Sequence, residues 1–502
     1  MPATKTRRSA LLALALLMAA AVPARATTPP SFTVIDSIRP GIDSSYGLDQ
    51  SLSAELNGYL YFSALDTDGR TQLFRSNGTT TELVKTINPT GYADPDGFTQ
   101  LGNALYFAAD DGTNSYELWR TDGTAAGTYM VKDINPTSGS DLWDFVRFGS
   151  YVYFTANDGT HGYELWRTDG TAAGTTMVKD IAESGDSDPK YMTAFGGYLY
   201  FRASDDMNGF ELWRTDGTSA GTTLVKDIDP SGSSSPRYFT VLNGALYFKA
   251  SDGTNGQEIW RTDGTSAGTT MVKDINPSGG SNTNVMAKLG SYLYFGATDG
   301  TNGFQLWRTD GTSAGTTLVK IINTSGDSYP RYLTTFGDHV YFQATDGSTG
   351  QELWITDGTE GGTTLLFEAT TGSNGGTPEF FTPVGDFLYF VAFDSVAERY
   401  YVYRTNGTIS ERVPFPIDAD QSVSCDCYDT NLVAVGGRLF STMYSDATGN
   451  EFAYLDEPTY VLPETNTAGG AGSAWTVALS ALALVTLAAG VGLRRRSGVA
   501  KS

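Results

Sequence analysis

Cysteine, histidine and basic residues are scarce in this chain, and each shortage excludes a class of function. The 502 residues include 2 cysteines and 2 histidines, too few for a disulfide scaffold, a four-thiolate zinc site or a histidine-rich metal centre. Lysine and arginine number 33 against 56 aspartates and glutamates, so the net charge is −23. Because an acidic surface repels phosphate backbones, we expect no nucleic-acid partner.

The N-terminal 26 residues have the pattern of a secretory signal peptide (1–26). Basic residues at Lys5, Arg7 and Arg8 precede an apolar run at 10–22, and the small residues of Ala24-Arg25-Ala26 suit cleavage. The sequence therefore predicts export, with an uncleaved N-terminal membrane anchor as the alternative.

The C-terminal segment has the pattern of an anchor. An uncharged run of 20 residues at 474–493 would cover about 30 Å as a helix, one hydrocarbon thickness. The basic tail 494–502 follows it, which predicts a cytoplasmic tail and a body outside the membrane. The chain is thus expected to contact a membrane through this helix.

The residues before that run, 462–473, contain a short motif and a Gly/Ala spacer. Leu462, Pro463 and Thr465 match the Leu-Pro-x-Thr-Gly motif, although Asn466 replaces the glycine. Together with the apolar run and basic tail, they resemble a bacterial surface-sorting signal of the sortase type. Plain C-terminal anchoring is the alternative, and both place the body at the cell surface or in the cell envelope.

The body between these ends is more acidic than the whole chain. The leader holds four basic residues, and the segment from Leu462 holds four basic residues and one acid. Residues 27–461 therefore carry 25 basic and 55 acidic side chains, a net charge of −30.

An internal repeat fills this body. The string Glu-Leu-Trp-Arg-Thr-Asp-Gly-Thr recurs with small changes every 47 residues, and weaker copies around Phe74, Tyr403 and Phe452 bring the number of units to nine. Its tryptophans, which we expect in the core, are Trp119, Trp166, Trp213, Trp260, Trp307 and Trp354.

Each unit contains four apolar or β-branched runs bounded by Gly, Asp or Asn, which is typical of four strands joined by hairpins. Four strands in about 47 residues predict an all-β fold, a β-propeller of antiparallel blades over 32–461. Residues 34–40 resemble a fourth strand and 432–455 supply three, so we expect N-terminal strand exchange to close the ring. Nine units favour nine blades. Eight blades with one atypical unit, and an open β-solenoid, are the alternatives.

The repeated string resembles the bacterial ELWxxDGT repeat of exported proteins, and the resemblance covers nearly the whole body. It implies a propeller-like architecture and little chemistry, because the function of that family is largely undefined.

Acidic residues in the turn between the second and third strands are candidate Ca²⁺ ligands, since oxygen ligands on a Gly-containing loop suit that ion. Ca²⁺ is the one cofactor that the pattern indicates. The alternative is a turn in which Asp caps the backbone and Gly takes a positive φ. The candidate ligands are Asp66, Asp68, Asp111, Asp158 and Asp252.

Other repeated polar residues favour structural roles. In the loop at 262–269 and its copies, Asp, Thr and Gly are expected to satisfy backbone groups within the turn. Arg120, Lys132 and their copies are expected to pair with repeat carboxylates. Cys425 and Cys427 predict a local disulfide, because export favours oxidation.

The sequence supports a binding module better than an enzyme. Its charged residues recur in every unit, as scaffold residues do, whereas catalysis needs one asymmetric group of side chains. We expect an exported, surface-anchored propeller that binds a glycan, a protein or another surface ligand. A carbohydrate lyase or hydrolase with paired carboxylates, best sought at 379–428, and a structural envelope component are the alternatives.

Overall fold

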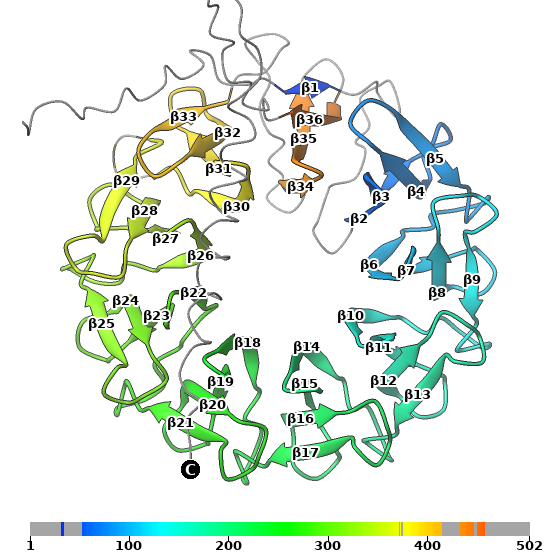
Figure 1. The fold of residues 1–502 in the computed structure, drawn as a ribbon, viewed down its shortest axis with the longest axis horizontal. Coiled ribbons are helices and arrows are strands. Elements are labelled where there is room, and N and C mark those ends of the chain that lie inside the picture. The colour runs from blue at the N-terminus through cyan, green and yellow to red at the C-terminus, as the bar shows by residue number, and fades with distance from the viewer. Residues whose placement is uncertain are drawn as a thin grey trace, which may run out of the picture. The chain divides into compact units, whose positions relative to one another are not determined.

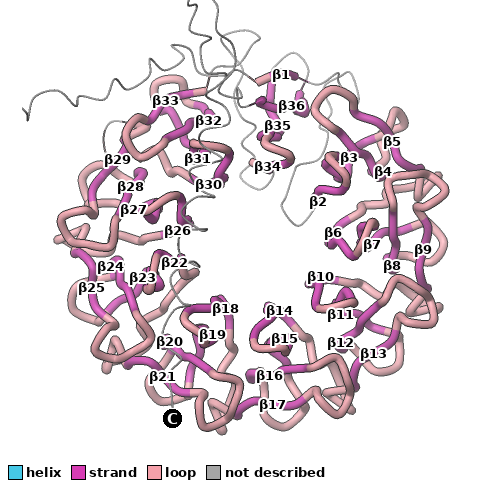
Figure 2. The backbone as a smooth tube through the Cα atoms, in the orientation of Figure 1, coloured by secondary structure: helices cyan, strands magenta, loops and turns pink. Residues whose placement is uncertain are grey.

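The computed structural model describes residues 32–34, 53–370, 372, 375–413, 432–445 and 449–456. The chain divides into two units, Met1–Glu457 and Pro458–Ser502, and all described residues lie in the first. These residues form strands and loops only (Figure 2). Among them, no helix is long and apolar enough to cross a membrane. The signal peptide, Cys425 and Cys427, the sorting motif, the apolar run and the basic tail lie outside the described residues and stay predictions.

The first unit consists of nine four-stranded antiparallel sheets, which confirms the all-β propeller with nine blades; eight blades and the open solenoid are wrong (Figure 1). Blades 1 to 3 comprise β2 (Ser53–Leu56), β3 (Tyr59–Leu65), β4 (Thr71–Ser76), β5 (Thr81–Lys85); β6 (Asp96–Leu101), β7 (Ala104–Asp110), β8 (Tyr116–Thr121), β9 (Tyr129–Lys132); and β10 (Trp143–Phe148), β11 (Tyr151–Asn157), β12 (Tyr163–Thr168), β13 (Thr176–Lys179). Blades 4 to 6 comprise β14 (Lys190–Phe195), β15 (Tyr198–Ala203), β16 (Glu211–Thr215), β17 (Thr223–Lys226); β18 (Arg237–Leu242), β19 (Ala245–Ser251), β20 (Gln257–Thr262), β21 (Thr270–Lys273); and β22 (Ala287–Leu289), β23 (Tyr292–Thr298), β24 (Phe304–Thr309), β25 (Thr317–Lys320). Blades 7 to 9 comprise β26 (Arg331–Phe336), β27 (His339–Ala344), β28 (Glu352–Thr356), β29 (Thr364–Phe367); β30 (Glu379–Val384), β31 (Phe387–Asp394), β32 (Arg399–Thr405), β33 (Ser410–Arg412); and β34 (Val433–Val435), β35 (Arg438–Ser445), β36 (Gly449–Asp456), β1 (Thr33–Val34).

Consecutive residues of the third strand face opposite neighbours. In β8, Leu118 is fully buried in a cluster with blade 3, whereas Trp119 is 6% exposed in a cluster with blade 1. A strand that is apolar on both faces needs a packed sheet on each side, and the ring supplies both. The repeated tryptophans are therefore core residues between blades, as predicted.

Nine hydrophobic clusters fill the nine seams between blades, one for each pair of neighbours. One of them joins blade 9 to blade 1 through Phe440, Tyr454 and Phe62. The ring is thus closed by packing as well as by strand pairing.

Strand exchange closes the last blade. β1 pairs antiparallel with β36, with Thr33 opposite Tyr454 and Val34 opposite Ala453. Phe32, next to this strand, is 1% exposed in the seam between blades 8 and 9. The expected closure is confirmed, and the pairing removes an open sheet edge.

Repeated cations connect each regular blade to the next. Lys132 Nζ donates to the carbonyl of Thr175, 2.8 Å away, and lies 5.6 Å from the ring centre of Trp166. Arg167 donates to the carbonyl of Gly217 at 2.7 Å and covers the ring of Tyr151. The expectation that these cations pair with repeat carboxylates is therefore wrong in the regular blades. Lys132 contacts a carbonyl oxygen and a tryptophan ring of the next blade, and Arg167 contacts a carbonyl oxygen of the next blade and a tyrosine ring of its own blade.

The flanking blades differ in this respect. Arg75 of blade 1 pairs with Glu82, and Arg404 of blade 8 pairs with Glu411, both within one blade. In these two blades, whose sequences depart from the repeat, the arginine of the third strand thus pairs with a carboxylate.

Deletion of residues 27–34 from the full-length chain should lower its melting temperature and promote self-association. The deletion removes β1 and Phe32 together, which exposes the edge of β36 and opens an apolar seam. Thermal unfolding and light scattering would measure both effects. An unchanged melting temperature and a monomeric variant would show that strand exchange does not hold the ring closed.

Candidate functional site

A buried glutamate at the start of the third strand holds the crossover to the next blade. Glu117, fully buried, accepts hydrogen bonds from the N–H groups of Ile134 at 2.8 Å and Asn135 at 3.3 Å. Ser140, just before the next blade, donates its hydroxyl to the same carboxylate at 2.7 Å. The contacts fix where the following innermost strand begins.

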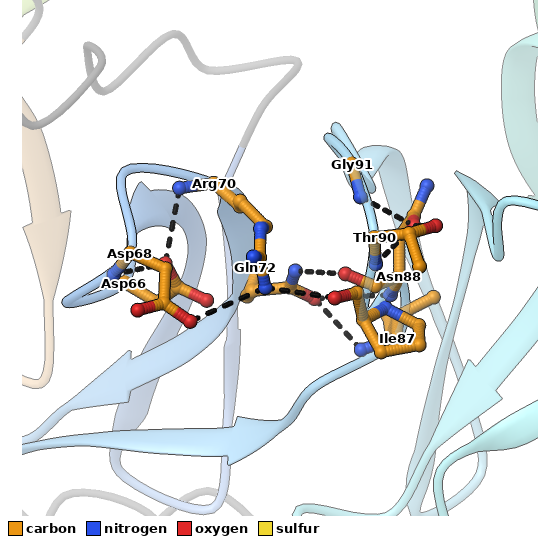
Figure 3. Close-up of polar contacts among 9 residues, drawn as sticks. Asp66, Asp68, Arg70, Gln72, Ile87, Asn88, Thr90 and Gly91 are labelled. Atoms are coloured by element: carbon orange, nitrogen blue, oxygen red, sulfur yellow. Dashed lines mark hydrogen bonds and ion pairs between the residues drawn. The ribbon is translucent and has the colours of Figure 1, made fainter.

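Glutamine takes this position in blades 1 and 6. Gln72 accepts from the N–H of Ile87 at 2.7 Å and donates to the carbonyl of Asn88 at 2.7 Å (Figure 3). Gln305 in the sixth blade accepts from Ile322 in the same way. An amide and a carboxyl group are thus interchangeable here, which indicates a neutral hydrogen-bonding role.

Burial raises the pKa of the glutamates that occupy this position in the other regular blades. For Glu117, Glu164 and Glu352 the pKa reaches about 7, because loss of water outweighs the backbone N–H donors and, at Glu117 and Glu164, a serine hydroxyl donor. A neighbouring acid, Asp133 in the case of Glu117, raises the pKa further. Raised carboxyl pKa values often mark catalytic acids, but here the group recurs around the ring and serves the scaffold.

The candidate calcium ligands cap their own turns. Asp111 accepts from the N–H groups of Thr113 and Asn114, both at 2.8 Å, and Asp158 and Asp252 make the equivalent contacts. Burial raises the pKa of Asp111, but these donors outweigh it and leave the pKa below its ordinary value. The contacts are those of the Asp-Gly turn that the sequence offered as the alternative.

The first-blade candidates lie in the turn before β4 (Figure 3). Asp66 accepts from the N–H groups of Asp68 and Arg70 at 2.9 and 3.0 Å, and Asp68 forms an ion pair with Arg70 at 3.2 Å. In the described part of the chain no three His, Cys, Asp or Glu side chains cluster as a metal site would require. Calcium binding stays a prediction.

The loop after each tryptophan satisfies its own polar groups, as predicted. In blade 5, Asp263 accepts from the N–H and hydroxyl of Thr265, and Thr262 and Thr269 share a hydrogen bond of 2.7 Å between their hydroxyls. The loop therefore has few free groups with which to bind a ligand.

Residues that do not repeat gather at the start of the innermost strands. There the first residue of each innermost strand lies opposite a residue of the second strand, and we call this the first cross-strand pair. In six blades the pairs are Asp96–Ala108, Trp143–Thr155, Lys190–Arg202, Arg237–Lys249, Arg331–Gln343 and Glu379–Val391. Figure 1 places these strands around the centre of the ring.

The next residue of the same strands has a left-handed backbone. Its φ is +69° at Gly97, but also +63° at Tyr191, +60° at Tyr238 and +54° at Tyr332. Such a φ at a bulky residue is strained by about 1–3 kcal/mol. Tyr191 is 39% exposed and Tyr332 46%, so core packing does not explain why these blades keep an aromatic ring.

Sequence reasoning missed this group, although the signal was present. Aligned at the 47-residue period, most positions of the repeat agree, whereas the first cross-strand pair changes from acid to cation to aromatic. Variation inside a regular repeat was the available clue.

The stretch at 379–428, where the sequence placed a unique site, is described up to residue 413. Glu379 hydrogen-bonds to Tyr332 of the preceding blade, and burial raises its pKa. Asp394 caps a turn through the N–H groups of Val396 and Ala397. Residues 414–428 lie outside the described part, so the pair of carboxylates required by an enzyme stays a prediction.

Neither a family model nor a curated protein matches the chain. Among solved structures it is similar to puromycin hydrolase, at 14% identity and a TM-score of 0.36 over 73% of this chain and 62% of that one. A mutant of that enzyme complexed with PGG gives the same identity and score over 70% and 58%. The chain thus spans about three fifths of those proteins. So distant a likeness carries no argument about function.

Lowering the pH from 8 to 5 should raise the melting temperature. The folded-state pKa of Glu117, Glu164 and Glu352 is about 7, above the ordinary 4.5, so folding favours the protonated form. This stabilisation is complete below about pH 4.5 and is lost as the pH rises through about 7. Thermal unfolding across this range would measure it.

The matched control replaces these three glutamates by glutamine, as Gln305 does naturally. The triple variant should show a flatter pH dependence and a higher melting temperature at pH 8 than the natural chain. Equal slopes would assign the effect to the general acidic charge of the body instead.

Proposed function

We propose that this chain is an exported, surface-anchored propeller that binds a ligand without transforming it. The leader and tail of the sequence support export and anchoring. The innermost edge of the ring, with the first cross-strand pairs and the adjoining tyrosines, is the proposed binding surface. A glycan is the proposed ligand class, because exposed aromatic rings beside polar groups suit the flat faces of sugars.

The contacts that the repeated charged groups make within the fold support binding over catalysis. The buried glutamates hold crossovers, the aspartates cap turns, and the lysines and arginines connect blades. Each of these groups is engaged in the scaffold and recurs around the ring. A reaction centre needs a nucleophile or base outside such contacts.

The observation that carries the proposal is the strained tyrosine of the innermost strands. Backbone strain is retained where the side chain that it presents is useful. Blade 2 has Gly97 at this position, so the fold itself accepts glycine there. Tyr191 and Tyr332 instead expose aromatic rings, although a positive φ strains the backbone at these residues.

Replacing Tyr191, Tyr238 and Tyr332 together by glycine should abolish glycan binding and leave the fold intact. Glycine adopts a positive φ without strain, and this relief offsets the roughly 0.5–1 kcal/mol that the extra chain entropy of glycine costs, so we expect the variant to remain folded. Binding of the natural and variant chains to a glycan array, with and without calcium, would measure the effect, and thermal unfolding would report the stability.

Tyr116→Phe is the control, because it alters a tyrosine of blade 2 that lies on the third strand and bonds Asp94. It should leave array binding unchanged. If the natural chain binds no glycan in either condition, the glycan-binding function is wrong; if the glycine variant binds as well as the natural chain, the binding surface lies elsewhere.

A further inference from the structure

Two neighbouring blades place like charges directly opposite one another. Lys190 lies opposite Arg202 in blade 4, and Arg237 lies opposite Lys249 in blade 5. Like charges at such positions destabilise an antiparallel pair. The chain has 33 basic and 56 acidic residues, so the gathering of four cations at two adjacent first cross-strand pairs needs an explanation.

Blade 4 neutralises its pair from within. Asp188, two residues before β14, forms ion pairs with Lys190 at 2.9 Å and with Arg202 at 3.3 Å. Asp144 of blade 3 adds a second acid, since it accepts from the N–H of Met192, and its carboxylate interacts with Lys190 and Arg202. The cations of blade 4 therefore have counter-ions of their own.

Blade 5 has the same backbone without the acid. Ser235 stands 47 residues after Asp188, and the two residues share a left-handed φ of +47° and +45°. The N–H of Ser235 donates to Phe210, as that of Asp188 donates to Tyr163 at the equivalent position. Blade 5 thus keeps the backbone position from which Asp188 reaches the cations of blade 4, but Ser235 has no carboxylate there.

The cations of blade 5 are left without a carboxylate partner. Within the described residues no ion pair joins Arg237 or Lys249 to an acid, and Arg237 Nε is buried with no hydrogen-bond partner. Burial, and then the charge of Arg237, lower the pKa of Lys249. Lys249 Nζ lies 5.9 Å from the ring centre of Tyr238, so a cation and an aromatic ring share this place.

We propose that blade 5 binds a carboxylate group of an acidic sugar chain, at the place that Asp188 fills in blade 4. The inference rests on the proposed glycan-binding function and names its ligand as a uronate. Arg237 and Lys249 supply the charge, and Tyr238 supplies a ring face for the sugar.

The deciding variant is Ser235→Asp, which supplies the internal counter-ion of blade 4 and removes no cation. Titration calorimetry of the full-length protein with an oligogalacturonate should show affinity lower by about 10- to 100-fold in this variant, the loss expected for a charged hydrogen-bonding contact. Its melting temperature should not fall, because Asp188 already adopts this backbone conformation.

Two further variants remove a cation and copy another blade. Lys249→Gln copies Gln343, and Arg237→Asn copies Asn284, so the fold accepts both residues at these positions. Each should weaken binding of the oligogalacturonate. The control, Ser266→Glu, copies Glu360 and adds the same negative charge to an exposed loop of blade 5; we expect it to change affinity by less than about twofold because salt screens distant charges.

The outcomes separate this inference from the proposed function. If the same oligosaccharide with its carboxylates reduced to alcohols binds as tightly, glycan binding stands and the carboxylate site is wrong. If oligoglutamate binds as tightly as the uronate and responds equally to Ser235→Asp, the ligand is an acidic peptide and the sugar assignment is overturned. Unchanged affinity of Ser235→Asp for the uronate would also overturn the site, and failure of every glycan to bind would overturn the proposed function too.

Discussion

The packing of strands that are apolar on both faces is the constraint on which this structure depends. Leu118 and Trp119 are adjacent in sequence, and each is buried against a different neighbouring blade. A sheet of this kind cannot stand alone in water, nor can an open row of such sheets protect its two ends. Closure of the ring, by the seam between blades 9 and 1 and by β1, follows from this requirement.

Given that packing, the polar residues of the repeat solve a second problem, the long crossover from the outer edge of one blade to the inner edge of the next. A buried side chain from the third strand supplies acceptors to the crossover backbone, whether it is Glu117 or Gln305. This accounts for buried acids that lack a cationic partner in the regular blades. It also explains why a carboxyl group recurs at this buried position in several blades.

The sequence was sufficient for the architecture because the period, the two-sided apolar strands and the excess fourth strand at the N-terminus are each visible in one dimension. It was insufficient for the cations, since a carbonyl oxygen such as that of Thr175 comes within reach of Lys132 only when two blades are placed together. The candidate site could not be predicted from the sequence for a related reason. Arg237 and Lys249 are unremarkable in sequence, and their juxtaposition depends on strand register. The strain at Tyr238 depends on a dihedral angle that the sequence does not display.

The connections between blades have one more consequence, which concerns how such a ring evolves. Lys132 reaches a residue 43 positions ahead and Arg167 one 50 positions ahead, so each connection ends within the next unit. Nearest-neighbour coupling of this kind makes the ring a sum of similar modules. Unequal recombination between two nearly identical copies would add or remove one whole module and leave every remaining connection matched to a partner. A change in one module, such as serine for aspartate before β18, would then alter a single segment of the inner edge while the others keep their form.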